Sequence, residues 1–320
     1  MSFSEPCALA VDFGGTSIKM GVTAGDRILA TADRIPTAMF ESPQAIIDAM
    51  IASARTLRGQ FPSACVMGMG MPGWCDYQRG VLYQLTNVRV WDREIPVKEM
   101  MEQALGLPVV LDNDANCMAY AEWKLGAGKG KRHLVCLTLG TGVGSGLIVN
   151  GELLRGATCS AGELGQTSID YRGRLGHYGN RGSLEDYVGN REIAADARTL
   201  YASHGIDKAI VDCNPISLER AALAGDEVAE QVWRDLAVKL SCALMNCCYL
   251  LNPEAIIIGG GVAKARTLLF QPLQEIMKTQ LAAPLVEYLE ILPAQFGTEA
   301  GILGAAHLAL NTHFGETFRA

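Results

Sequence analysis

Two turns rich in glycine and threonine follow apolar segments at separate places in the chain. The first is Asp12-Phe-Gly-Gly-Thr16 and the second is Gly140-Thr-Gly-Val-Gly144. Backbone N–H groups and a threonine hydroxyl in such a turn can donate to phosphate oxygens, because glycine lets a ligand approach the backbone closely. Neither turn continues into the Gly-Lys-Ser/Thr of a Walker A loop. One such turn alone fits an ordinary hairpin equally well, but two of them can bind one polyphosphate from both sides.

Two aspartates stand where carboxylates could take part in this chemistry. Asp12 ends an apolar segment and could hold Mg²⁺ directly or through its water ligands. Asp114 directly precedes a helical run over 115–125. It fits an N-cap, worth about 1 kcal/mol, and equally a general base at the carboxyl end of a strand. Asn113 and Asn116 flank it, and such a group of hydrogen-bonding side chains suits a sugar.

The elements around the two turns repeat. Residues 9–22 and 134–149 each contain an apolar strand, a Gly/Thr-rich turn and a second apolar strand. A short polar turn and further strand-like sequence follow in both places. We interpret this as one supersecondary unit used twice, near the start of each of two domains.

The rest of the chain alternates between helix and strand patterns. Ser42-Pro43 indicates a helix N-terminus, and apolar residues spaced every three or four positions predict a long core helix over 232–251. Strands are expected over 64–70, 109–111 and 255–258, the last of which runs into Gly259-Gly-Gly261. The alternation predicts the α/β class.

Length and composition restrict the function classes. The 320 residues fit two domains, for which we expect the ranges 1–118 and 119–320, with the C-terminal helix packing back on the first. Hydrophobic residues make up 49% and charged residues 19% of the chain, which is typical of a globular protein. The net charge of −7 argues against nucleic acid or an anionic membrane as the main partner.

The expected location is cytoplasmic. The first ten residues lack the features of a signal peptide. The longest stretch without Asp, Glu, Lys or Arg, 133–151, contains five glycines, which argues against a membrane span. The ten cysteines include no C-x-x-C pair, so we expect reduced, buried thiols.

Taken together, the chain resembles the ROK family of sugar kinases and repressors, within the actin-like ATPase superfamily. Seven motifs match in order over nearly the whole chain: Asp12-x-Gly-Gly-Thr-x-x-Lys19, Gly70-x-Pro-Gly73 with Asn87 and Trp91, Asn113-Asp-Ala-Asn116, Leu139-Gly-Thr-Gly-Val-Gly144, Ala161-Gly-Glu-Leu-Gly165, Gly179-Asn-Arg-Gly-Ser-Leu-Glu185 and Gly259-Gly-Gly261. The resemblance implies an actin-like ATPase (ribonuclease H-like) fold, α/β in class, in two domains with a cleft between them.

The resemblance also implies ATP and Mg²⁺ as cofactors and assigns roles to residues. Asp114 becomes the general base, and Asp12 becomes the residue that holds Mg²⁺, either directly or through water. The residues implied for ATP and phosphate are Asp12, Gly14, Gly15, Thr16, Lys19, Gly140, Thr141, Gly142, Gly259, Gly260 and Gly261. The residues implied for the sugar are Gly73, Asn87, Asn113, Asp114, Glu163, Gln166 and Glu185.

One departure from the family concerns its structural zinc. The family commonly holds zinc with a histidine and three cysteines, and the matching positions here are Gln166, Gly176, Tyr178 and Ser183. A tetrahedral zinc site needs its N and S ligands, so we expect no zinc. We expect burial of Tyr178 instead, with Gln166 and Ser183 hydrogen-bonding across the old site. The family histidine touches the sugar, so Gln166 is expected to tune which sugar is accepted.

Three functions are considered for a chain with these motifs. The first is transfer of the γ-phosphoryl group of ATP to a hexose, with glucose at O6 as the first choice. N-acetylmannosamine, N-acetylglucosamine, fructose, mannose, allose and a polyphosphate donor remain alternatives. A repressor is disfavoured because only 11 residues precede Asp12, too few for a DNA-binding domain. A non-catalytic sugar-binding protein is disfavoured because binding needs no base. As members of the family are usually dimers or tetramers, a homodimer or homotetramer is expected, with no nucleic-acid or membrane partner.

Overall fold

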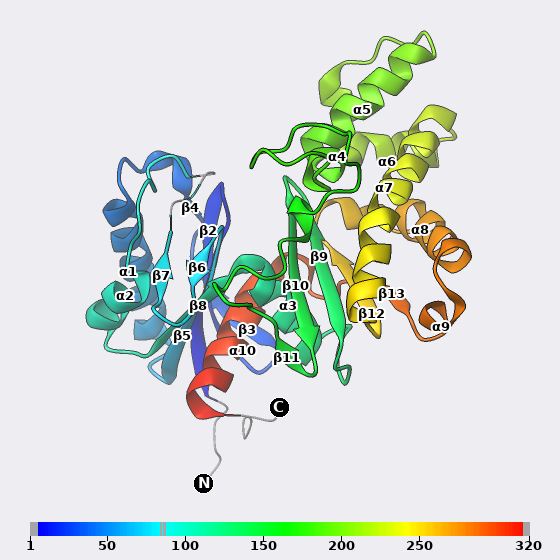
Figure 1. Ribbon diagram of the computed structural model, residues 1–320. Coiled ribbons are helices and arrows are strands. Elements are labelled where there is room, and N and C mark those ends of the chain that lie inside the picture. Colours follow the sequence, from blue (N-terminus) through cyan, green and yellow to red (C-terminus); the bar gives the residue numbers. More distant parts are fainter. Residues whose placement is uncertain (1–5, 84, 86–87, 316–320) are drawn as a thin grey trace. The chain divides into compact units, whose positions relative to one another are not determined.

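The structure is a computed structural model that describes residues 6–83, 85 and 88–315. Its internal contacts divide the chain into two units (Figure 1). Unit 1 comprises Met1–Lys129, Leu153–Ala161 and Thr298–Ala320, and unit 2 comprises Gly130–Glu152 and Gly162–Gly297. The first division falls after residue 129 instead of the expected 118, because the helix that follows Asn113 packs within unit 1.

Unit 1 is built on a six-stranded sheet with the order β3-β2-β1-β5-β8, and β4 pairs with β2. β1 pairs antiparallel with β2, while β1, β5 and β8 run parallel. The strands are β1 (Cys7–Phe13), β2 (Ser17–Ala24), β3 (Arg27–Thr31), β4 (Ile35–Pro36), β5 (Ala64–Met71) and β8 (Val109–Asn113), and a separate hairpin joins β6 (Cys75–Asp76) to β7 (Val81–Leu82).

Helices cover both faces of this sheet (Figure 1). They are α1 (Pro43–Gln60), α2 (Val97–Leu105), α3 (Asp114–Lys124) and α10 (Ala300–Phe314). In β1, Leu9 and Val11 face the core shared with α1 and α2, whereas Ala8 and Ala10 face α10. The helix from the end of the chain therefore completes the core of unit 1.

Two glycines let α10 approach its neighbours closely. A Cβ on Gly68 in β5 would overlap the carbonyl of Ala305, and one on Gly304 would overlap the carbonyl of Cys117 in α3. These backbones touch where any larger residue would force them apart, and this contact fixes α3, the helix that carries Asp114, against α10.

A buried ion pair lies at the end of β8. The Asp112 side chain is 1% exposed, and its Oδ2 accepts from Nε and Nη2 of Arg155, both at 2.8 Å. The guanidinium carbon of Arg155 lies 3.8 Å from the centroid of the Tyr77 ring. Arg155 belongs to the short Leu153–Ala161 segment of unit 1, so this pair attaches that segment to the sheet.

Unit 2 contains a five-stranded sheet with the order β11-β10-β9-β12-β13. β9 and β10 form an antiparallel hairpin, and β12 runs parallel to β9 and β13. The hairpin beside a parallel strand repeats the arrangement of β1, β2 and β5, which confirms the predicted repeat. The strands are β9 (Leu134–Leu139), β10 (Val143–Val149), β11 (Glu152–Leu153), β12 (Ala255–Gly259) and β13 (Glu290–Pro293).

The long helix α7 organises the core of unit 2, with α8 beside it (Figure 1). Asp226 caps its N-terminus, and Asn252 ends it in the left-handed conformation with φ of 45°. No described helix is long and apolar enough to cross a membrane. The helices are α4 (Glu185–Val188), α5 (Asn190–Ser203), α6 (Pro215–Leu223), α7 (Glu227–Leu251), α8 (Thr267–Gln280) and α9 (Ala283–Val286).

The ten cysteines are all free, and seven of them are buried, as predicted. Burial raises the pKa of the Cys117 thiol well above its ordinary value and raises that of Cys248 to about 12. These thiols therefore stay protonated and act as small apolar groups.

We expect Gly304→Ala to destabilise the protein by about 1–3 kcal/mol, because the added methyl overpacks the contact between α10 and α3. The matched control is Gly59→Ala on the exposed side of α1, where a Cβ meets no atom within 4 Å. That change should stabilise by about 0.5–1 kcal/mol through helix propensity. Urea unfolding of both variants checks this, and equal shifts in the same direction would contradict the packing argument.

Arg155→Met should cost about 3 kcal/mol of stability, since it leaves the Asp112 carboxylate buried without its cation. The control is Arg79→Met, which removes a pair with Glu94 whose side chains are 59% and 47% exposed, so a much smaller loss is expected. The unfolding midpoints in urea give the comparison. Equal losses in the two variants would mean that the Asp112 pair has no special role.

Candidate functional site

The first Gly/Thr turn, Gly14–Thr16, joins β1 to β2, and hydrogen bonds from Thr37 hold it in place. Gly14 N–H donates to the Ser17 carbonyl at 3.0 Å, and the Thr37 hydroxyl donates to the Gly15 carbonyl at 2.8 Å. Thr37 N–H also donates to the Thr16 carbonyl at 3.1 Å. Thr37 thus bonds the carbonyls of Gly15 and Thr16, and Thr16 is exposed. The turn can therefore present N–H groups and the Thr16 hydroxyl to an anion.

Asp12 and Lys19 lie opposite each other across this hairpin. The Lys19 ammonium donates to Asp12 Oδ2 at 2.6 Å and to the Thr298 carbonyl at 3.2 Å. A Cβ on Gly301, in the first turn of α10, would overlap the Asp12 carboxyl. Lys19, expected to bind phosphate, therefore also orients Asp12. The Asp12 carboxylate is an oxygen ligand of the kind that binds Mg²⁺, which usually keeps several of its water molecules.

Hydrogen bonds at the end of β8 identify the residue that caps α3. Asn113 is the N-cap, and its Oδ1 accepts from Ala115 N–H at 2.8 Å and from Asn116 N–H at 3.2 Å. Asn113 Nδ2 donates to the Gly73 carbonyl at 3.0 Å, and Gly73 has φ of +70°. Asp114 is thus the first helical residue, and its Oδ1 accepts from Ala115 N–H at 2.9 Å. The cap alternative for Asp114 is wrong because Asn113 takes that position.

The Asp112 carboxylate arranges the residues around Asp114. Its Oδ1 accepts from Asn113 N–H at 2.7 Å and from Asn116 Nδ2 at 2.8 Å, while its Oδ2 binds Arg155. Asn116 is 2% exposed, so it supports the strand end and does not face a ligand. The motif reading missed Arg155, whose pairing across 43 positions of sequence leaves no local signal.

The second turn, Gly140–Gly142, joins β9 to β10 in unit 2. Gly140 N–H donates to the Gly142 carbonyl at 3.0 Å, and Asn190 N–H donates to the Gly140 carbonyl at 2.9 Å. Thr141 is exposed. Val143 N–H, directly after the turn, donates to Glu185 Oε2 at 2.8 Å.

The Gly259–Gly261 loop follows β12 and lies beside the second turn. Gly260 has φ of +87°, and a Cβ there would overlap the backbone of Leu139, the last residue of β9. Only glycine fits this contact. The two glycine segments that the sequence assigned to the nucleotide are therefore neighbours within unit 2.

The loop with Glu163 and Gln166 is anchored on β10. Ser145 in β10 donates its hydroxyl to the Gly162 carbonyl and accepts from Leu164 N–H at 3.1 Å. Glu163 is exposed, and a 3-10 turn, Leu164–Gln166, follows it. Gln166 Nε2 reaches Glu185 Oε1 at 3.4 Å. Unit 2 thus brings Gln166, Glu185 and the second turn together.

Tyr178 differs from its expectation. Its side chain is 54% exposed, so the predicted burial is wrong. Partial desolvation raises the pKa of the Tyr178 phenol, and the charges of Glu163 and Glu185 raise it further. The phenol therefore lies near both predicted sugar-binding glutamates, a neighbourhood that the sequence reasoning missed because it compared this position only with a cysteine.

Hydrogen bonds close the loop that holds zinc in the family. Gly176 N–H donates to the Asn180 carbonyl at 2.7 Å, and Asn180 Nδ2 donates to the Gln166 carbonyl at 2.8 Å. Of the two residues expected to hydrogen-bond across the old site, Gln166 bonds to Asn180 and Glu185, whereas the prediction is wrong for Ser183, whose buried hydroxyl has no partner among the described residues.

The four positions of this loop do not fit zinc. Gln166 has an amide, Gly176 has no side chain, Tyr178 has an exposed phenol and Ser183 has a hydroxyl. Among the described residues, no group of three or more His, Cys, Asp or Glu side chains could hold a metal ion. The lack of structural zinc stays a prediction, for metal analysis of the purified protein to check.

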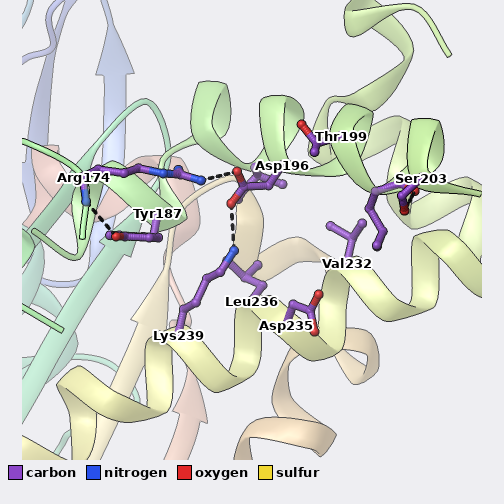
Figure 2. Close-up of a pocket in the computed structure, with 11 residues that line it drawn as sticks. Arg174, Tyr187, Asp196, Thr199, Ser203, Val232, Asp235, Leu236 and Lys239 are labelled. Atoms are coloured by element: carbon purple, nitrogen blue, oxygen red, sulfur yellow. Dashed lines mark hydrogen bonds and ion pairs between the residues drawn. The ribbon is translucent and has the colours of Figure 1, made fainter. Parts of the chain in front are cut away.

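A groove of about 330 Å³ between α5 and α7 lies apart from these residues (Figure 2). Arg174 and Lys239 both point at Asp196, and Lys239 Nζ lies 2.8 Å from its Oδ2. With Asp235, which also lines the groove, two acidic side chains balance the two cationic ones, and the groove contains no predicted site residue. Asn87, a predicted sugar ligand, lies outside the described residues.

The ROK family profile matches residues 8–312. A glucokinase of Streptomyces coelicolor is 34% identical over 315 residues, covering 94% of this chain and 96% of that one. The structure of a ROK family glucokinase from Streptomyces griseus in complex with glucose and AMPPNP has a TM-score of 0.80 and 32% identity, covering 95% of this chain and 99% of that one.

A ROK hexokinase from Thermus thermophilus gives the same TM-score of 0.80, with 29% identity and coverage of 96% and 99%. These similarities extend over nearly the full chains, so they confirm the actin-like ATPase fold and the α/β class. The chain belongs to the ROK family.

Proposed function

We propose that the protein transfers the γ-phosphoryl group of ATP to O6 of a free hexose, with glucose as the preferred acceptor and Asp114 as the general base. The observation that carries the proposal is the capping of α3 by Asn113. Since the helix has its cap, the adjacent Asp114 carboxylate is not needed for that purpose. It stands at the carboxyl end of a parallel strand, where ligands bind in open α/β sheets.

The coarser part of this function rests on the relatives. The chain is a sugar kinase, as its similarity to glucokinases and to the Streptomyces griseus enzyme over nearly its whole length indicates. ATP as the donor is supported by the AMPPNP complex of that relative. Glucose is proposed because both of these relatives are glucokinases.

In the proposed reaction, the hexose O6 attacks the γ-phosphorus, the O6–P bond forms, and the bond from phosphorus to the ADP oxygen breaks. The O6 proton passes to the Asp114 carboxylate. An aspartate of ordinary basicity can serve, because in a loose transition state the proton leaves late. The positions of Asn113 and Asp114 depend on the Asp112 carboxylate and its hydrogen bonds.

On the phosphate side, the proposed donors are the Thr16 and Thr141 hydroxyls and the N–H groups of the two turns, other than those of Gly14 and Gly140, which already bond to backbone carbonyls. Asp12, oriented by Lys19, would hold Mg²⁺ through water. When bound, the Mg²⁺ ion neutralises charge on the transferred group. Gly259, Gly260 and Gly261 are proposed to lie under the adenosine.

For the sugar side we propose Glu163, Gln166 and Glu185 as hydroxyl partners, with Gly73 and Asn113 shaping the loop near the base. The half-buried Gln166 and Glu185 select hydroxyl positions, because a sugar that lacks the matching hydroxyl leaves them unpaired. A homodimer or homotetramer is the proposed assembly.

The test is phosphorylation of a panel of sugars with ATP and with polyphosphate. Glucose with ATP should give the highest kcat/KM. A higher value for mannose, fructose, allose or an N-acetylated hexosamine would overturn the assignment of glucose, and a preference for polyphosphate would overturn ATP. Sugar binding without any transfer would instead identify a non-catalytic sugar-binding protein.

Asp114→Asn should lower kcat by about 10²–10⁴-fold while sugar affinity changes little, because only the proton acceptor is lost from an isosteric side chain. Steady-state kinetics and calorimetric sugar titration measure the two effects. Asp48→Asn on the exposed side of α1 removes an equal charge and should keep the wild-type rate. If Asp114→Asn retained more than about a third of the wild-type rate, Asp114 would not be the base.

Gln166→Ala should alter the ratio of kcat/KM between hexoses that differ at C2 more than it alters kcat for the best sugar. An amide offers one acceptor and two donors, so its loss changes which hydroxyl pattern is satisfied. The same sugar panel gives the ratios. A uniform loss on every sugar, accompanied by a lower unfolding midpoint, would assign Gln166 to support of the loop alone.

A further inference from the structure

The Glu185 carboxylate contacts two parts of unit 2 that the proposed function assigns to different substrates. Its Oε2 accepts from Val143 N–H at 2.8 Å, at the end of the second phosphate turn. Its Oε1 lies 3.4 Å from Gln166 Nε2, in the loop proposed to bind the hexose. One side chain therefore connects the nucleotide side and the sugar side within a single unit.

The contact with the turn is close. A Cβ on Gly142 would overlap Glu185 Oε2, so a larger residue at this position would displace the carboxylate from its place beside the turn. The other anchor of the turn, Asn190 N–H on the Gly140 carbonyl, comes from the start of α5, directly after α4. A shift of residues 185–190 would therefore move the turn.

The turn is also in contact with the Gln166 loop. A Cβ on Gly165 would overlap the Val143 carbonyl, so this loop packs directly on the residue that Glu185 holds. Val143 is thus fixed by Glu185 through its N–H and by Gly165 through its carbonyl side. Both neighbours belong to segments that carry proposed sugar ligands.

The two hydrogen bonds of the Glu185 carboxylate differ in strength. The bond to Val143 N–H has ordinary length, whereas 3.4 Å to Gln166 lies beyond the usual range for N–H···O bonds. Ionised carboxylates can accept about four hydrogen bonds. Oε1 can therefore take a stronger donor, and a sugar hydroxyl forms a short, charge-assisted bond to a carboxylate.

We infer that Glu185 is a positioning residue through which hexose binding raises the affinity of the second turn for the phosphates of the nucleotide. This inference rests on the proposed function. A hydroxyl bonded to Oε1 fixes the carboxylate and, through Oε2, the Val143 N–H. The turn is then ordered before the nucleotide arrives, which reduces the ordering cost of phosphate binding. By linkage, the nucleotide raises hexose affinity by the same factor.

The test is calorimetric titration of the intact protein with AMPPNP and Mg²⁺, without and with a saturating concentration of the best hexose acceptor. In the wild type the hexose should tighten AMPPNP binding about fivefold or more, the lower end of typical coupling. In Glu185→Ala the factor should fall below about two. The control, Glu192→Ala, removes an acidic side chain of α5, which pairs with Arg191, and should keep the wild-type factor.

A second variant is needed because Glu185→Ala also removes a proposed hexose ligand, and loss of hexose binding alone would abolish the coupling. Gly142→Ala keeps Glu185 but displaces its carboxylate from Val143 through the added methyl group, so the coupling factor should again approach one. The factor is a ratio of two affinities, so a uniform effect of either substitution on nucleotide binding or stability cancels.

Wild-type coupling that persists in both Glu185→Ala and Gly142→Ala would overturn the inference. A wild-type factor of one in an enzyme that phosphorylates the hexose would do so too, while leaving the proposed function intact. Failure of the proposed function itself has a different signature, the absence of sugar phosphate from the wild-type reaction.

Discussion

The ion pair of the buried Asp112 carboxylate is the interaction on which the end of unit 1 that carries the proposed base depends. A charge that is 1% exposed must be compensated, or its desolvation destabilises the fold. Arg155 supplies the opposite charge, while Asn113 N–H and Asn116 Nδ2 satisfy the other oxygen. These bonds fix the start of α3 and so determine where the neighbouring Asp114 carboxylate can lie.

Both Gly/Thr turns are stabilised by a side chain from elsewhere in the same unit. Thr37 binds the Gly15 carbonyl in unit 1, and Glu185 binds Val143 N–H in unit 2. A glycine-rich turn loses much conformational entropy when it is ordered, and such contacts hold it in one form. The difference is that Glu185 also contacts Gln166, so the second turn is connected to a sugar loop.

Local patterns predicted the elements of this fold well, and long-range contacts were missed. The two hairpins, the helix after Ser42, the core of α7 over 232–251 and the buried cysteines follow from periodicity, capping and composition. The start of α7 at Glu227, capped by Asp226, was not predicted. The pair between Asp112 and Arg155 is separated by 43 residues and has no local signature. The pair between Asp12 and Lys19 could have been found from hairpin register, since the two residues are opposite each other across a short turn.

In the proposed reaction a phosphate ester forms at O6 of a hexose with ATP as the donor. This is tested by ³¹P and ¹³C NMR of the products from uniformly ¹³C-labelled glucose, ATP and Mg²⁺. We expect a new phosphate ester resonance coupled to C6, formed in step with ADP. Release of inorganic phosphate without a carbon-coupled phosphorus signal, or an ester at another carbon, would contradict it.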